Sequence, residues 1–123
     1  MERKISLAIG DFVTRYGLEK SLDIAKQVGA DGIDFDLHRY NLFDGRDPMY
    51  SKSEEEFKAY FENIRKEVEK RGLVVFQAHG TMRTFMEDNE EYNTVTFPRN
   101  AECDLKAASI LGAKYCVFHP GSD

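Results

Sequence analysis

The sequence contains only three prolines and nine glycines in 123 residues, too few for a fibrous repeat or a low-complexity chain. It also has no apolar run approaching the roughly eighteen residues of a membrane-spanning helix. The start, Met1 to Lys4, leads into a short apolar segment rather than into the core of a signal peptide. We therefore expect a soluble, cytoplasmic protein without a membrane partner.

Cysteine is scarce as well. The two cysteines, Cys103 and Cys116, are far from the Cys-x-x-Cys spacing of zinc knuckles and redox motifs. Two isolated cysteines suit a reducing compartment. We expect two half-buried free thiols rather than a disulfide or a zinc site.

Positive charge is also in deficit. There are 17 Lys and Arg residues against 22 Asp and Glu, which gives a formal net charge of −5. Affinity for nucleic acids comes mainly from clustered Lys and Arg, so this balance disfavours a nucleic-acid partner. A local basic patch could still outweigh the net charge.

What is present is a globular composition, 41% hydrophobic, in a chain of one-domain length. Short β-like runs alternate with helical stretches, which predicts a parallel α/β fold of four strands joined by three helices. The first strand is apolar on both faces, as expected where helices cover a sheet. The predicted strands are Ile5 to Ile9, Gly32 to Leu37, Leu73 to Ala78 and Tyr115 to Phe118.

Helical periodicity falls between these strands. The first helix has apolar positions from Leu18 to Val28 and ends at a glycine. The second begins at Ser53, where a capping box with Glu56 explains the run of three glutamates as a helix start. The third begins near Pro98, with Ala101, Leu105, Ala108 and Leu111 predicted on its buried face. A long polar loop, 81–97, is expected to be functional or mobile.

Four parallel strands form either a small open sheet or half of an eight-stranded barrel. A complete (β/α)8 barrel needs about 250 residues, so 123 is close to half. The turn from Gly10 to Thr14 lacks the glycine-rich phosphate cradle of a Rossmann fold. We therefore predict the N-terminal half of a TIM barrel, with a flavodoxin-like or Rossmann sheet as the alternative.

All three histidines follow predicted strands, where the reactive groups of parallel barrels converge. His79 and His119 come directly after apolar strands and are the strongest candidates. His38 lies in a segment that also fits an ordinary polar loop. Asp36 is either a substrate-binding carboxylate or a loop cap, and Asp34 is expected to pair with a neighbour or cap a backbone group.

Several segments together resemble the xylose isomerase-like TIM-barrel superfamily. They are Ile5 to Ile9, Gly29-Ala30-Asp31-Gly32-Ile33, His79-Gly80 and the stretch from Leu111 to Ser122, which ends in His-Pro-Gly-Ser. That superfamily contains sugar phosphate isomerases and epimerases and the endonuclease IV type of apurinic-site nuclease. The resemblance implies that residues 1–123 are strands one to four of such a barrel.

The resemblance also implies a function, namely metal-assisted proton transfer on a sugar, a sugar phosphate or a polyol. Asp36, His38, His79 and His119 would line the substrate pocket. His79 and His119 match positions that bind zinc in the nuclease branch, so they would be an incomplete ligand set for a divalent metal such as Zn, Mn, Mg or Co. The remaining ligands and the catalytic base would lie in strands five to eight.

Two alternatives to the sugar enzyme stay open. An apurinic-site nuclease is disfavoured because the segment Ile9 to Val13 lacks that branch's histidine loop. A non-catalytic half-barrel could instead assemble with itself, as a homo-oligomer, or with a partner chain through its fourth strand. In each case we expect the 123-residue chain alone to be inactive.

Overall fold

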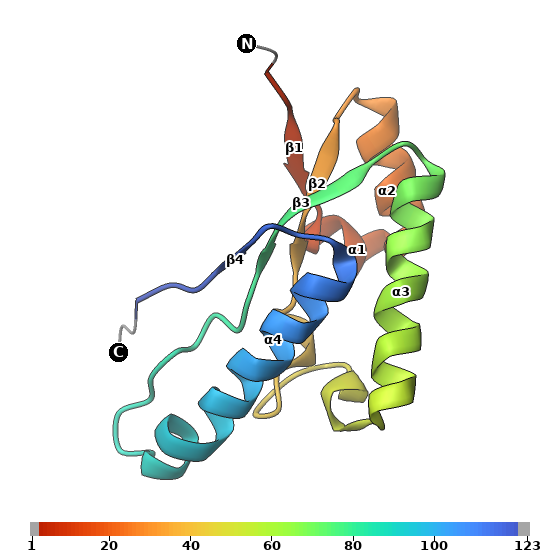
Figure 1. Cartoon of the computed structure of the whole chain (residues 1–123). Helices are drawn as coiled ribbons and strands as arrows, with labels where there is room; N and C mark the ends of the chain where they lie inside the picture. The colour runs from red at the N-terminus through yellow and green to blue at the C-terminus, as the bar shows by residue number, and fades with distance from the viewer. Residues whose placement is uncertain (1–2, 121–123) are drawn as a thin grey trace.

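The computed structural model describes residues 3–120. They form one parallel sheet whose spatial order follows the chain (Figure 1). The strands are β1 (Ser6–Ala8), β2 (Gly32–Asp36), β3 (Val74–His79) and β4 (Tyr115–Val117). The prediction of a parallel α/β fold is confirmed. A four-stranded parallel sheet is compatible both with half of a barrel and with a small open sheet.

Four α-helices accompany the sheet. They are α1 (Gly10–Tyr16), α2 (Leu18–Gln27), α3 (Glu54–Lys70) and α4 (Phe97–Leu111). The last three lie on one side of the sheet (Figure 1). Short helical turns, η1 (His38–Tyr40), η2 (Pro48–Ser51) and the π-helical η3 (Tyr92–Thr96), lie in the connections. No helix within residues 3–120 is long and apolar enough to cross a bilayer.

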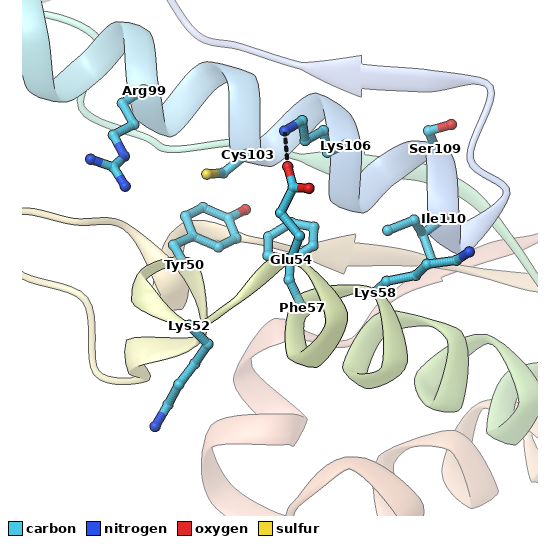
Figure 2. Close-up of a pocket in the computed structure, with 10 residues that line it drawn as sticks. All are labelled: Tyr50, Lys52, Glu54, Phe57, Lys58, Arg99, Cys103, Lys106, Ser109 and Ile110. Carbon is cyan, nitrogen blue, oxygen red and sulfur yellow. Dashed lines mark ion pairs between the residues drawn. The ribbon is translucent and has the colours of Figure 1, made fainter.

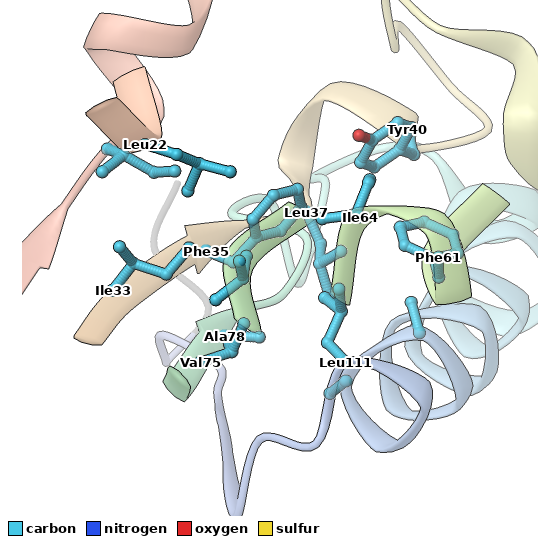
Figure 3. Close-up of a cluster of buried hydrophobic side chains, with 14 of the residues drawn as sticks. Leu22, Ile33, Phe35, Leu37, Tyr40, Phe61, Ile64, Val75, Ala78 and Leu111 are labelled. Carbon is cyan, nitrogen blue, oxygen red and sulfur yellow. The ribbon is translucent and has the colours of Figure 1, made fainter. Parts of the chain in front are cut away.

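The core lies between the sheet and these helices (Figure 3). From β2, Ile33 and Phe35 point into it and are almost fully buried, as alternate residues of one sheet face must be. Phe61 of α3 and Leu111 of α4 meet them from the helical layer. The predicted start of α3 is confirmed, because Ser53 Oγ accepts a hydrogen bond from the Glu56 amide at 3.2 Å.

The opposite face of the sheet is open within the described residues. Ser6 and Ala8 of β1 are exposed, and Tyr115 of β4 is 68% exposed. The expectation that the first strand is covered on both faces is therefore wrong. Helices α2, α3 and α4 cover one side of the sheet, and the other side carries the polar side chains of Asp34, Asp36, Gln77 and His79.

A bulge between β2 and β3 determines which polar side chains of β3 lie next to Asp34. The pairing passes from Ile33 opposite Val75 to Asp34 opposite Gln77, which leaves Phe76 as the extra residue. The Phe76 ring fills the space beside Gly32, where a Cβ atom would lie 2.7 Å from it. The bulge thus places Gln77 and His79 beside Asp34.

Two predictions about the helices need correction. Helix α1 was not predicted, because its residues have no buried face. The loop predicted up to residue 97 is shorter, since the chain is helical from Glu90 and passes through η3 into α4. The Phe97 amide bonds to the Tyr92 carbonyl five residues back, just before Pro98, which has no amide hydrogen to donate.

The buried face of α4 also differs from the prediction. Leu105 is 55% exposed, whereas Asn100 and Asp104 are fully buried. Each buried polar side chain has a partner from another segment: Asn100 Oδ1 accepts from the Leu42 amide, and Asp104 binds Tyr50. Hydrophobic periodicity could not find this face, because hydrogen bonds across the fold compensate its burial.

Candidate functional site

The carboxyl ends of the strands form a cavity of about 260 Å³ on the open face of the sheet. Asp34 and Asp36 of β2, His79 of β3 and His119 after β4 line it. His38 lines a neighbouring hollow that shares Asp36. The structure therefore brings three of the four predicted site residues to one cavity and places the fourth beside it.

Asp34 holds His79 in one orientation. Its Oδ1 lies 2.8 Å from His79 Nδ1, and its Oδ2 accepts a hydrogen bond of 2.7 Å from Gln77 Nε2. The Asp34 side chain is 11% exposed, and both of its carboxylate oxygens have a partner. A carboxylate at Nδ1 favours the tautomer with the proton there, so Nε2 keeps its lone pair as a hydrogen-bond acceptor and base.

His38 is held in the opposite tautomer. The Met82 amide donates to His38 Nδ1 at 3.0 Å, so Nδ1 must carry the lone pair and the neutral ring carries its proton on Nε2. The His38 amide donates to Asp36 Oδ1 at 2.9 Å. Asp36 is thus a loop cap, one of its two predicted roles, while it also lines the cavity.

His119 stacks on His79. The ring centroids are 5.6 Å apart, with 16° between the ring planes. His119 is exposed, and its carbonyl oxygen accepts a hydrogen bond from Thr84 Oγ1 at 3.0 Å. This places a second imidazole beside the first, at the mouth of the cavity.

These residues do not complete a metal centre. Residues 3–120 contain no group of three His, Cys, Asp or Glu side chains arranged to hold a metal ion. Asp34 also occupies His79 Nδ1, which leaves one ring nitrogen for any ligand. The predicted pair His79 and His119 falls short of the three protein ligands usual at catalytic zinc, so the donor set present does not fit such an ion by itself.

Sequence reasoning missed Gln77 and Asp104. Asp104 is fully buried on α4, where it accepts hydrogen bonds from Tyr50 Oη at 2.5 Å and from the Thr81 amide at 2.7 Å. Burial raises the pKa of this carboxyl group above its usual 3.8, against the opposing effect of these donors. Asp104 thereby anchors the turn that follows His79. The only feature of the sequence that pointed to Asp104 was a charged residue within the apolar stripe of the third predicted helix.

The two cysteines match their prediction. Cys103 and Cys116 are both free and half-buried. Burial raises the pKa of both thiols, that of Cys116 to about 11.

The opposite tautomers of His38 and His79 are directly testable. Nitrogen-15 NMR of the imidazoles at a pH where both are neutral should show a protonated Nδ1 in His79 and a protonated Nε2 in His38. In Asp34→Leu, His79 should shift toward the Nε2-protonated form, while His38 should keep its tautomer. The same tautomer in both rings of the unaltered protein would contradict the site described here.

Comparison with known proteins adds one finding. No family model matches the chain, and neither does any curated protein. Among solved structures, it is similar to the apo crystal structure of the 3-keto-D-glucoside 4-epimerase YcjR from E. coli, with a TM-score of 0.63 and 18% sequence identity. The match covers 94% of this chain and 37% of the epimerase chain. At this identity the likeness concerns the fold.

These findings correct the family prediction. The resemblance to the xylose isomerase-like superfamily rested mainly on the segment ending in His-Pro-Gly-Ser, of which Gly121 and Ser122 lie outside the described residues. The other segments are short strand and helix-end patterns, which many α/β chains share. No family model supports it, and the structure that matches is described as a 3-keto-D-glucoside 4-epimerase. We therefore do not assign the chain to that superfamily. What the comparison establishes is a fold shared with part of that epimerase.

Proposed function

We propose that this chain contributes to the active site of a sugar isomerase or epimerase, in which His79 moves a proton on a small sugar or sugar phosphate. The observation that carries the proposal is the Asp34–His79 pair at 2.8 Å, which leaves Nε2 of His79 as a base. The pair lies at the carboxyl end of a parallel sheet, where α/β enzymes bind their substrates. The description of the similar structure as a sugar epimerase supports the same class of substrate.

The chemistry follows from the two tautomers. The lone pair of His79 Nε2 takes the proton from the carbon next to a carbonyl group, and the electrons of that C–H bond form the carbon–carbon double bond of an enediolate. The carbonyl oxygen gains the negative charge, which a donor such as the Nε2 hydrogen of His38 stabilises. A proton given back to the same carbon on its other face, by a second acid outside His79, yields the epimer. A proton given by His79 to the former carbonyl carbon, with transfer of the hydroxyl proton to the former carbonyl oxygen, yields the isomer.

A divalent metal, Zn, Mn, Mg or Co, stays a prediction. Such an ion would polarise the substrate carbonyl. Because residues 3–120 do not complete its ligand set, no step above passes through it. Asp36, His38 and His119 are proposed to contact the substrate beside His79.

We also propose that the four strands are half of a (β/α)8 barrel. The sequential strand order, with α2, α3 and α4 on one face and Asp34, Asp36 and His79 lining a cavity on the other, supports this arrangement. The chain spans 37% of the length of the matched epimerase, so residues outside it would complete the site.

The test is exchange of substrate protons with solvent. The protein that contains residues 1–123 together with the residues that would complete the barrel is incubated in D₂O with aldoses, ketoses, their phosphates and 3-keto-glucosides, with and without each of the four metals, and deuterium at carbon is followed by NMR. We expect incorporation next to the carbonyl group of at least one class. If no substrate exchanges faster than in buffer under any of these conditions, the proposal is wrong.

A further inference from the structure

A second cavity, of about 480 Å³, lies between α3 and α4, in the helical layer rather than at the strand ends (Figure 2). Helix α3 contributes Phe57 and Lys58, and α4 contributes Arg99 and Lys106. Tyr50 comes from η2, just ahead of α3. None of the residues assigned to the candidate active site lines this cavity, which we call the helical groove.

The helical groove is positively charged in a protein with a net charge of −5. Four basic side chains line it, against one acidic side chain, Glu54. Lys106 is compensated, because its Nζ lies 3.6 Å from Glu54 and 3.7 Å from Glu102. Lys52 and Arg99 form no ion pair within residues 3–120. Two basic residues without an ion pair, Lys52 and Arg99, therefore line one hollow.

The floor of the helical groove is apolar. The rings of Tyr50 and Phe57 lie 5.7 Å apart and are tilted by 38°. The Cys103 thiol and Ile110 continue this surface along α4 (Figure 2). The stems of the surrounding lysines widen it, because their methylene groups can cover apolar surface while the ammonium groups stay in water.

We propose that the helical groove binds an organic anion with a flat apolar body and one carboxylate group. The body would lie on the Tyr50 and Phe57 floor, and the carboxylate would meet Arg99 and Lys52. An apolar floor with a few charged groups at its rim is the usual build of a small-molecule site. Arg99 suits the carboxylate because a guanidinium group can donate two parallel hydrogen bonds to it. This inference does not depend on the proposed function.

Cys103 provides a reporter within the groove. The probe is naphthalene-2-carboxylate, and the readout is the rate at which methyl methanethiosulfonate modifies each cysteine, followed by peptide mass spectrometry. Both thiols should react slowly, since burial raises their pKa values. We expect the probe to slow modification of Cys103 in a saturable way and to leave the rate at Cys116, on β4, unchanged.

Two comparisons test the roles of charge and apolar body. The neutral isostere naphthalene-2-carboxamide should bind about five-fold more weakly, and acetate at the same concentration should not protect Cys103. The double variant Lys52→Gln/Arg99→Gln should raise the Kd of the carboxylate about five-fold. The matched control Lys66→Gln/Lys114→Gln removes the same charge outside the groove and should change it less than about two-fold.

Several outcomes would overturn the inference. They are absence of protection at Cys103, equal protection at Cys116, equal binding of the carboxamide, protection by acetate alone, or equal weakening by the control variant. Each would show that the cavity does not recognise an apolar carboxylate through Lys52 and Arg99.

Discussion

His79→Gln should lower the rate of proton exchange at the substrate carbon by about 10²- to 10⁴-fold, because glutamine can hydrogen-bond to Asp34 but cannot take up a proton. The loss should fall on kcat, with a smaller change in KM, since the proton moves only in the chemical step. The effect is measured as the rate of deuterium incorporation into whichever substrate class exchanges in the test described under the proposed function.

The control for this prediction is Glu87→Gln, an exposed position in the loop after β3, which should leave the rate unchanged. Asp34→Asn should also lower kcat strongly, because an asparagine amide that donates to His79 Nδ1 moves the ring proton to Nε2 and removes the base. A His79→Gln protein that exchanges protons at the full rate would remove His79 from the mechanism.

Asp104→Ala should reduce the free energy of unfolding by about 2–4 kcal/mol, because it leaves two donors, Tyr50 Oη and the Thr81 amide, without their buried acceptor. Urea denaturation followed by circular dichroism gives the value. Asp44→Ala is the control: its ion pair with Arg83, at 3.3 Å, is exposed and should cost less than about 1 kcal/mol. Equal losses in the two variants would contradict the buried role of Asp104.

The same carboxyl group predicts a pH dependence. Its pKa is raised in the folded protein above the usual 3.8, so between these two values the folded state binds more protons than the unfolded state. This contribution to stability is complete below the unfolded pKa and is lost as the pH rises through the folded pKa. Asp104→Asn should flatten that part of the profile. A profile that keeps its shape in the variant would show that another group titrates there.

Helix α3 illustrates what local sequence can predict. The structure confirms its predicted N-cap serine, and the apolar residues that follow at helical spacing, Phe57, Phe61, Ile64 and Val68, are buried. The placement of His79 and His119 at one edge of the sheet also followed from chain order, because parallel strands present their carboxyl ends together.

The buried face of helix α4 and the β2–β3 bulge could not be predicted from local sequence. The burial of Asp104 depends on hydrogen bonds from Tyr50 and Thr81, which are distant from it in sequence. The bulge at Phe76 depends on how two strands pair, so no single segment encodes it visibly. Both features arise from contacts between segments that are far apart in the chain.

By itself, the sequence determined the order of the elements and the gathering of histidines at the strand ends, because periodicity, caps and parallel connections act over short stretches. Only the tertiary structure decided which face of the sheet stays open and which tautomers His38 and His79 adopt. It also decided that Lys52 and Arg99, distant in sequence, both line one groove. These properties depend on which groups come within hydrogen-bonding or contact distance, and the fold alone sets that distance.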